Sequence, residues 1–293
     1  MELEQLRHFV RVAETQNFTR AAEQAGLSQS AVSRSVAKLE EEFGRPLFER
    51  QTRKVVLTDT GQLLLNRARN VLTMLDDVKT EIGDDGQSGK LRVAAIPTIA
   101  PYFLPERLRS FGKRFPRSQL IVIEDTTDML LKKIADGEVD VAIAALPIGA
   151  KHLEVEPLFE EELLLVTSRD HPLAARKSVG VADIAEIPFV LLGEAHCLSE
   201  NVISYCRQRS FHPVFVEQTT QLSTVQELVA LGHGVSLIPE MARVRDTNPT
   251  RVYRSLSGRK PMRTIAMITN PYRYNSRILR EFQTHLRGGK SPK

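Results

Sequence analysis

The sequence lacks several features that mark particular classes of protein. None of its apolar runs approaches the ~20 residues that a membrane-spanning helix requires, so we expect no membrane partner. Only two of its 293 residues are cysteine, which is too few for the disulfide framework of a small secreted domain. The first residues also lack the apolar segment of a signal peptide. These absences predict a cytoplasmic protein, and no pattern in the sequence requires a cofactor.

The chain also has little excess of either charge. Its formal net charge of +4 is only a weak indication of a polyanionic partner. Within residues 1–60, nine Lys and Arg residues face nine Asp and Glu residues, so that 9 − 9 = 0. A nucleic-acid interface in that segment therefore has to come from the placement of basic side chains rather than from their number.

What the sequence does contain is a pair of cysteines, Cys197 and Cys206, in a stretch that is predicted to be helical. Ser199 is a suitable N-cap, and Val202 and Ile203 fall with Cys206 on one apolar face. Nine helical steps separate the two Cα atoms by roughly 13 Å, whereas a disulfide tolerates at most about 7 Å. A bond between the two sulfurs therefore requires partial unwinding, which makes the segment a candidate redox switch.

The two thiols are predicted to differ in reactivity. Cys197 lies just ahead of the predicted helix, beside His196, where exposed amide groups favour thiolate over thiol. Cys206 lies on the apolar side and is expected to be inert. The alternative is that both are ordinary small hydrophobes of a reduced cytosol. A metal site is disfavoured, because a fourth ligand at a sensible spacing is missing.

The first sixty residues carry the pattern of a helix-turn-helix. We expect helices over residues 3–13, 20–25 and 29–43. Thr19 and Ser28 are the candidate N-caps of the second and third helices, and Gly26 supplies the turn between them. The apolar interior is predicted to contain Ala21, Ala22, Leu27, Val32 and Val36.

The third helix begins with side chains that can read base edges in double-stranded DNA. These candidates are Ser28, Gln29, Ser30, Ser33 and Arg34. A predicted hairpin over residues 46–58 forms a wing in which Arg50, Arg53 and Lys54 are suited to phosphate or minor-groove contact. The alternative is a generic small helical domain with a solvated charged surface.

A long helix capped by Thr58 is predicted to follow. Its apolar residues recur at spacings of four and three, at Leu64, Ala68, Val71, Leu75, Val78 and Ile82. Such a seam favours pairing with a second chain, and packing on the chain's own body is the alternative. Residues 84–90 are then predicted to form a flexible hinge.

From Leu91 onward, apolar strands alternate with amphipathic helices, which indicates an α/β fold with a mainly parallel sheet and two subdomains. Strands are expected at 91–96, 119–124, 139–145, 162–168, 188–192, 213–217, 234–238 and 263–269. Helices are expected near 102–115, 127–136, 199–210, 221–232 and 276–287. The chain is expected to cross between the subdomains near 161–164 and 264–268.

Three polar residues of this region are candidates for ligand contact. Thr98 and Thr127 each lie where a strand gives way to a helix, a place that suits an anion or a polar ligand. A helix N-cap is the alternative role for both. Arg263 is predicted either to face a cleft or to form a structural ion pair.

The N-terminal segment resembles the LysR-type transcriptional regulators. The resemblance is carried by Phe9, residues 17–23, 27–29, 31–33, Leu39, Glu40, Gly44, residues 47–50, Leu57, Thr58 and Gly61. Residues 96–98, 137–140 and 232–239 resemble the effector domain of the same family, which looks like a periplasmic solute-binding protein.

This resemblance implies a division of the chain. It implies a winged helix-turn-helix over 1–60, a linker dimerisation helix and hinge over 61–89, and a regulatory domain over 90–293. Subdomain I of the regulatory domain would hold about 90–162 and 267–293, and subdomain II about 163–266.

Within the family, the chain resembles the OxyR branch of thiol-based peroxide sensors. The matching segments are 96–105, 157–165, 170–174, 196–198 with Cys206, and 263–265. Ala195, Ser199 and Glu200 depart from the usual residues of that branch. The alternative function is a LysR-type regulator that binds a small organic effector and has incidental cysteines. A cysteine enzyme is disfavoured by the DNA-binding segment.

The OxyR resemblance implies roles for individual residues. Cys197 would be the peroxidatic thiolate and Cys206 the resolving thiol, with Thr98, Thr127, His196 and Arg263 around the hydrogen peroxide. It also implies a homo-oligomer, a dimer through the linker helix and a tetramer beyond it, on an inverted-repeat operator. A cellular dithiol reductant would reset the switch.

Overall fold

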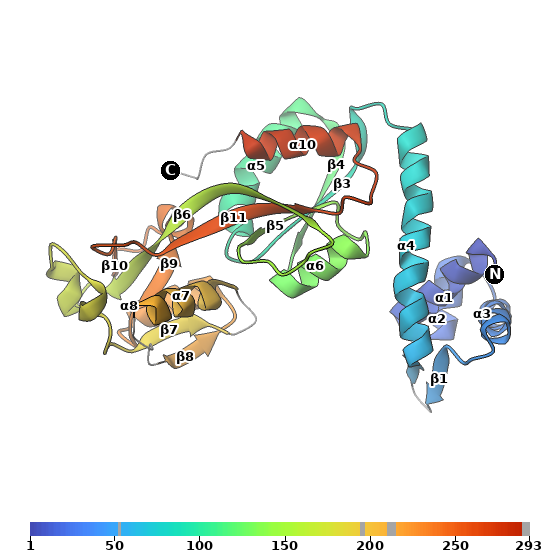
Figure 1. Cartoon of the computed structure of the whole chain (residues 1–293), viewed down its shortest axis with the longest axis horizontal. Coiled ribbons are helices and arrows are strands. Elements are labelled where there is room, and N and C mark those ends of the chain that lie inside the picture. Colours follow the sequence, from blue (N-terminus) through green and yellow to red (C-terminus); the bar gives the residue numbers. More distant parts are fainter. Residues whose placement is uncertain (52–53, 194–196, 210–214, 289–293) are drawn as a thin grey trace. The chain divides into compact units, whose positions relative to one another are not determined.

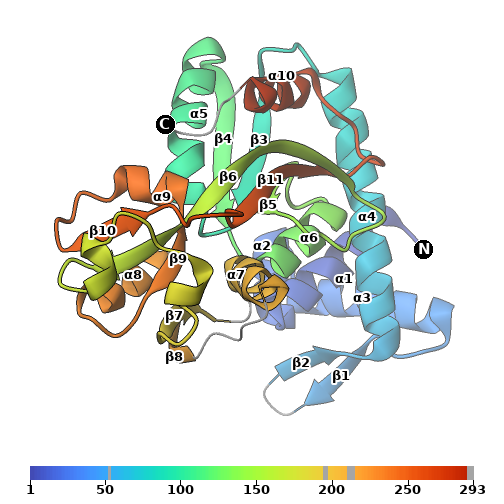
Figure 2. The same cartoon turned by 60° about the vertical axis from the view of Figure 1, so that its left-hand side comes forward.

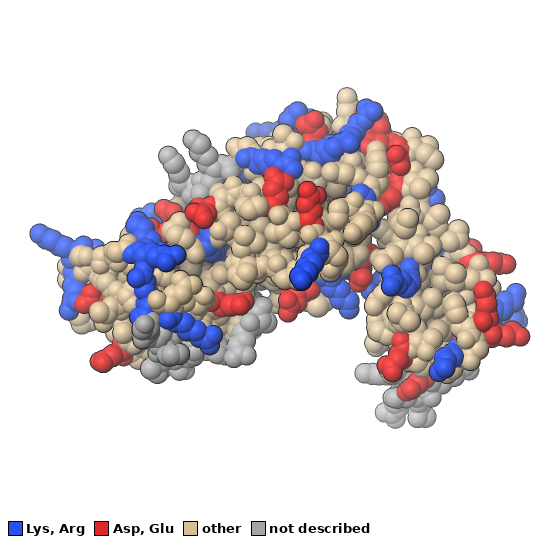
Figure 3. All heavy atoms as spheres, viewed as in Figure 1, with Lys and Arg blue, Asp and Glu red and all other residues tan. Residues whose placement is uncertain are grey.

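The computed structural model describes residues 1–51, 54–193, 197–209 and 215–288. The chain forms two compact units, Met1–Gly83 and Asp84–Lys293, whose elements are drawn in Figures 1 and 2. Among the described residues, no helix has the length and apolar character needed to span a membrane. Acidic and basic side chains are interspersed over the visible face of each unit (Figure 3).

The first unit packs helices against a two-stranded hairpin. Its elements are α1 (Leu3–Thr15), α2 (Phe18–Ala25), α3 (Gln29–Phe43), β1 (Phe48–Gln51), β2 (Lys54–Leu57) and α4 (Asp59–Ile82). β1 and β2 pair in antiparallel register. The ring of Phe48 lies 5.3 Å from that of Phe9 and 5.7 Å from that of Phe18, between centroids. These rings join the hairpin to the helical core.

Two of the three helix caps predicted for the first unit are confirmed. The Ser28 hydroxyl accepts the Ala31 N–H at 3.3 Å, and the Thr58 hydroxyl accepts the Gly61 N–H at 3.0 Å. Thr19 as a cap is wrong. The side chain of Asn17 accepts the backbone N–H groups of Thr19 and its neighbour, so α2 begins one residue after Asn17.

The predicted interior is confirmed except at one position. Ala21, Ala22, Val32 and Val36 are all buried, whereas Leu27 is 44% exposed. The backbone explains this difference. Gly26 has φ +66° and ends α2, and the Leu27 N–H donates to the Ala22 carbonyl at 3.0 Å. Leu27 therefore completes the turn with its backbone and leaves its side chain at the surface.

The predicted apolar seam of α4 is divided. Ala68 is buried in the core of the first unit and Leu64 packs partly against that core. Further along the helix, Val71, Val78 and Ile82 are 41%, 52% and 84% exposed. Only the later turns of α4 therefore leave an apolar stripe uncovered within this unit.

The second unit contains most of the strands. It begins with β3 (Ser88–Ala95), α5 (Ala100–Arg114), β4 (Arg117–Glu124), α6 (Thr127–Ala135), β5 (Val141–Ala145), β6 (Glu154–Ser168) and two 3₁₀ turns, Pro172–Ala175 and Val181–Asp183. It continues with β7 (Phe189–Leu192), α7 (Cys197–Gln208), β8 (Phe215–Thr219), α8 (Leu222–Ala230), β9 (Ser236–Pro239), α9 (Glu240–Arg245), β10 (Arg251–Arg254), β11 (Met262–Thr269) and α10 (Arg277–Arg287). Neither α9 nor β10 was predicted from the sequence.

The main sheet has the order β10-β6-β11-β5-β3-β4, and β9 also pairs with β6. β3 pairs in parallel with β4 and β5, but β11 pairs antiparallel with β5 and β6, and β6 pairs antiparallel with β9 and β10. The expectation of a mainly parallel sheet is therefore wrong. β6 carries the chain out of the first half of the sheet and β11 brings it back, so the two strands must run in opposite directions.

Two hydrophobic clusters lie along this sheet. The first is formed around β3, β5, α5, α6 and α10, and the second around β7, α7, α8 and β9. β6 contributes to both, with Phe159 at the first cluster and Leu163, Leu165 and Val166 in the second. In Figure 1, α5 and α10 cover one face of the first half and α6 covers the other.

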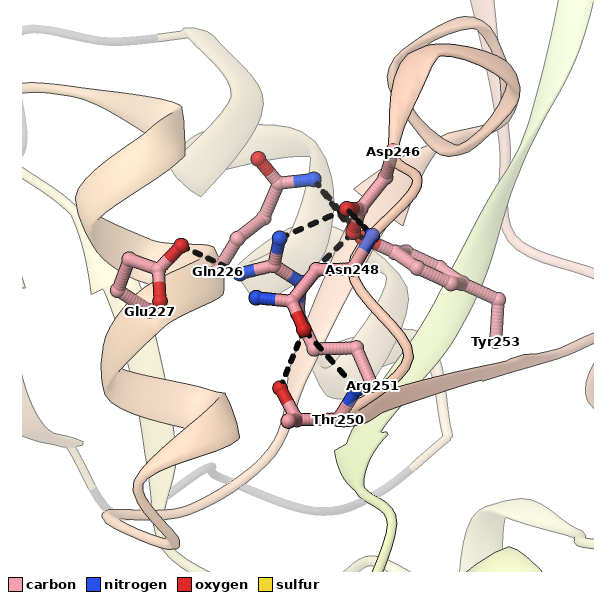
Figure 4. A network of polar contacts seen from close by, with 7 residues as sticks. All are labelled: Gln226, Glu227, Asp246, Asn248, Thr250, Arg251 and Tyr253. Atoms are coloured by element: carbon pink, nitrogen blue, oxygen red, sulfur yellow. Dashed lines mark hydrogen bonds and ion pairs between the residues drawn. The ribbon is translucent and has the colours of Figure 1, made fainter.

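A polar network stiffens the second half (Figure 4). Arg251 holds Asp246 through two hydrogen bonds of 2.7 Å and reaches Glu227 at 2.9 Å. Tyr253 also donates to Asp246 and accepts from Gln226. The network joins α8, β10 and the turn after α9.

Candidate functional site

Both cysteines belong to α7, and both are free thiols. Cys197 is the first residue of the helix, so the prediction that it precedes the helix is wrong by two positions. Ser199 consequently lies inside the first turn and is not the N-cap. Its buried hydroxyl donates instead to the Leu192 carbonyl at 2.6 Å. Nine residue steps of continuous helix separate the two cysteines, so their Cα atoms lie roughly 13 Å apart, beyond disulfide reach.

Cys206 lies in an apolar environment. It is fully buried and belongs to the second hydrophobic cluster, together with Val202. Burial raises the pKa of the Cys206 thiol to about 12, because a thiolate would lose its hydration there. Cys206 is therefore a neutral thiol at physiological pH.

Cys197 has different neighbours. It is half-buried and packs against the first hydrophobic cluster. It lines a narrow pocket at the ends of β3 and β4, together with Ile96, Pro97, Thr98, Thr126, Thr127 and Leu198. Cys197 also lies at the N-terminal end of α7, where the backbone amide groups of the first turn have no carbonyl partner within the helix.

Thr127 brings an unusual group to this pocket. It is the first residue of α6, and its buried hydroxyl has no hydrogen-bond partner. A buried polar atom without a partner costs about 1–3 kcal/mol. The pocket beside Cys197 therefore contains one hydroxyl whose hydrogen-bonding capacity is unused.

Arg263 contacts Thr98 by hydrogen bonds and forms a structural ion pair with Glu161. Its guanidinium donates to the Thr98 hydroxyl at 2.9 Å and to the Thr98 carbonyl at 3.1 Å. On the adjacent strand, Glu161 accepts from Arg263 at 2.6 Å, and both side chains have no exposed surface. The other Glu161 oxygen accepts the Met241 N–H at 3.1 Å. Arg263 thus holds Thr98 at the pocket wall.

Sequence reasoning missed Glu161, although it stands directly opposite Arg263 in the pairing of β6 with β11. The Glu-rich segment 160–162 on an otherwise apolar strand was the available signal. Two hydrogen bonds that hold α7 were also not predicted from the sequence. The Asn201 side chain donates to the Leu146 carbonyl at 3.0 Å, and the Tyr205 hydroxyl donates to the Arg259 carbonyl at 2.8 Å.

Three other residues that the sequence analysis singled out near the cysteines are His196, Ala195 and Glu200. His196 and Ala195 lie outside the described residues. Glu200 is exposed in the first turn of α7. Within the described parts of the chain, no group of His, Cys, Asp and Glu is placed to hold a metal ion.

The first unit presents the predicted base-reading residues at the start of α3. Ser28, Gln29, Ser30 and Arg34 are exposed, and Ser33 is half-buried. Of the predicted wing residues, Arg53 lies outside the described residues. Arg50 and Lys54 lie in the paired strands β1 and β2, and only their backbone is described.

Family models match both units of the chain. Residues 84–290 match the LysR substrate binding domain, and residues 3–62 match the bacterial regulatory helix-turn-helix protein, lysR family. These matches bear out the predicted fold of a helix-turn-helix followed by an α/β regulatory domain.

Individual relatives agree with the family models. A probable hydrogen peroxide-inducible genes activator of Streptomyces viridosporus is 40% identical over 273 residues, which cover 90% of this chain and 86% of that protein. The full-length OxyR of Pseudomonas aeruginosa, in a cysteine-to-aspartate form, has a TM-score of 0.80 at 31% identity. The match covers 98% of this chain and 93% of the Pseudomonas chain. A cysteine-to-serine mutant of Corynebacterium glutamicum OxyR with hydrogen peroxide bound has a TM-score of 0.66 at 31% identity. That match covers 98% of this chain and 92% of the Corynebacterium chain.

The matches to both family models, together with relatives that are similar over almost the whole chain, place it among DNA-binding regulators rather than enzymes. The chain belongs to the LysR family of helix-turn-helix transcriptional regulators and, within it, to the OxyR group of hydrogen peroxide-inducible genes activators.

Proposed function

We propose that this protein senses hydrogen peroxide at Cys197, converts the signal into a Cys197–Cys206 disulfide, and thereby changes how it regulates oxidative-stress genes. The observation that carries the proposal is the pocket that Cys197 shares with the unpartnered hydroxyl of Thr127. The hydrogen peroxide-inducible relatives and the peroxide-bound OxyR of Corynebacterium glutamicum support the same assignment.

In the first step, the Cys197 thiolate attacks one oxygen of hydrogen peroxide. A sulfur–oxygen bond forms, the oxygen–oxygen bond breaks, and the departing hydroxide takes up a proton to leave as water. Cys197 becomes a sulfenic acid. The hydroxyls of Thr98 and Thr127 line the pocket in which the departing oxygen needs hydrogen-bond donors, and Arg263 keeps Thr98 in place.

In the second step, the sulfur of Cys206 displaces the sulfenic oxygen as water and forms the disulfide. The two sulfurs meet only when α7 unwinds. Unwinding breaks the bonds that Ser199 and Asn201 make to the Leu192 and Leu146 carbonyls, and it withdraws Cys206 from the second hydrophobic cluster. A cellular dithiol reductant supplies two electrons and restores both thiols.

The unwinding of α7 has to alter the DNA-binding unit if it is to act as a signal. We propose that the uncovered stripe of Val71, Val78 and Ile82 on α4 joins two chains into a dimer. Two-fold pairing predicts inverted-repeat half-sites one helical turn or a multiple of it apart. The same proposal includes assembly into a tetramer. It also includes the predicted division of the chain into residues 1–60, 61–89 and 90–293, the last with two regulatory subdomains.

Mass spectrometry tests the proposal directly. Reduced full-length protein is treated with a slight molar excess of hydrogen peroxide, and its disulfides are mapped while operator contacts are followed by footprinting. We expect a Cys197–Cys206 bond together with an altered footprint. Cys206→Ser should stop at the sulfenic acid, and Cys197→Ser should not react.

Two results would contradict the proposal. A disulfide that forms while the footprint stays unchanged would show that the bond is not a signal. Absence of any reaction at Cys197 under these conditions would favour a regulator of the organic-effector kind, with incidental cysteines.

A further inference from the structure

A second pocket also reaches Cys197. It has a volume of about 450 Å³ and is lined by Thr127, Asp128, Leu131, Pro147, Ile148, Gly149, Cys197 and Glu200. It shares Thr127 and Cys197 with the narrow pocket described above. Exposed residues on its lining show that it opens to solvent. This pocket is therefore a route from solvent to Cys197.

The charged side chains that line this route are both acidic. Asp128 lies in the first turn of α6 and Glu200 in the first turn of α7, and both are exposed. The lining contains no lysine or arginine among the described residues. A molecule that approaches Cys197 by this route therefore meets two negative charges.

We propose that Asp128 and Glu200 form an electrostatic screen that admits neutral oxidants to Cys197 and slows anionic ones. This selectivity rests on the proposed function, since it concerns which oxidants that sensor accepts. Hydrogen peroxide is uncharged at neutral pH and passes freely. Peroxynitrite and hydroperoxides that bear a carboxylate are anions and are repelled, as are small thiols that bear carboxylates.

The size of the effect follows from Coulomb's law. Two unit charges about 6 Å apart in water repel each other enough to lower a rate roughly 3-fold. Two carboxylates together should therefore lower the rate for a singly charged anion by up to about 10-fold. Because both side chains are exposed, the effect should shrink as the salt concentration rises.

Alkylation measures this screen without any peroxide. Iodoacetamide is neutral and iodoacetate is an anion, and both attack the same thiolate. The ratio of their rates is therefore independent of how much thiolate is present. The rates are measured at Cys197 of the reduced full-length chain by peptide mass spectrometry, at low and at high salt.

We expect Glu200→Gln and Asp128→Asn each to raise the iodoacetate-to-iodoacetamide ratio about 3-fold, and the double variant about 10-fold at low salt. Glu186→Gln is the matched control, since Glu186 is an exposed carboxylate that is not among the residues lining the pocket. A ratio that stays constant in the double variant, or that rises equally in the control, would overturn the screen.

The outcome is separable from that of the proposed function. If the ratio rises but hydrogen peroxide leaves Cys197 unchanged, the screen exists and the sensing proposal fails. If hydrogen peroxide oxidises Cys197 and the ratio does not move, the sensor stands without charge selection.

Discussion

Cys197 and Cys206 share one helix but pack against different hydrophobic clusters of the second unit. Cys197 is half-buried, packs on the first hydrophobic cluster and borders a pocket with a free hydroxyl. Cys206 is fully buried in the second cluster and has a thiol whose pKa is raised to about 12. The difference shows that one helix can place two thiols in unlike surroundings. In the proposed mechanism, position rather than residue type therefore sets the order in which the two cysteines react.

The largest expected effect concerns the inert thiol. In folded Cys197→Ser, the remaining Cys206 should be alkylated by iodoacetamide at pH 8 at least ~10³ times more slowly than in urea, because little thiolate forms below its raised pKa. The folded rate should climb as the pH rises toward about 12. Equal rates in the folded and unfolded protein would remove the contrast between the two cysteines.

A second substitution removes the support beneath the Cys197 pocket. Glu161→Gln leaves the guanidinium of Arg263 buried without its carboxylate, so urea unfolding of the full chain should show a loss of about 3–5 kcal/mol. The control is Glu156→Gln, whose partner Arg287 lies in an exposed pair. That control should lose less than about 1 kcal/mol. Similar losses in both variants would mean that the buried pair has no special role.

The free hydroxyl can be removed by itself. Thr127→Val should slow the oxidation of Cys197 about 10-fold, since one donor to the departing oxygen is lost. The reduced protein should not be destabilised, because the hydroxyl has no partner to lose. Thr167→Val is the control, since its buried hydroxyl is also unpartnered but lies on β6, away from the pocket. Stopped-flow oxidation and urea unfolding measure the two effects, and an equal slowing in both variants would argue against a role for Thr127.

The smallest effect concerns how α7 is held. Ser199→Ala removes the bond to the Leu192 carbonyl and should lower the free energy of opening α7 by about 1–2 kcal/mol. Hydrogen exchange of the α7 amides should then be faster, and the disulfide should close several-fold sooner after oxidation. Ser204→Ala, on the exposed side of the same helix, should change neither quantity. An unchanged closure rate in Ser199→Ala would show that this bond does not limit unwinding.

Features of the fold that depend on neighbours in sequence could be predicted. The Ser28 and Thr58 caps and the turn at Gly26 follow from a few adjacent residues, and the structure has them. The alternation of strands and helices after Leu91 was also recognised. Leu27 was misplaced because its backbone, rather than its side chain, completes the turn.

Features that join distant segments could not be predicted. The Arg263–Glu161 bond joins residues 102 positions apart, and it depends on the register between β6 and β11. The antiparallel direction of these two strands depends in turn on the path of the chain, which leaves the first half of the sheet along β6 and returns along β11. The sequence shows that both strands are apolar and extended, but not which partner each one takes. Likewise, Ser199 is not a cap because the helix begins at Cys197, two residues before the start of the predicted range 199–210.

The length of α7 has a consequence for how a population of molecules responds. The helix spans 12 residues, and isolated helices shorter than ~12–15 residues are marginal in water. In the proposed switch, release of its anchors would therefore leave α7 without a stable half-wound form. A graded dose of oxidant would then change the fraction of molecules in which α7 is unwound, rather than distort α7 slightly in every molecule.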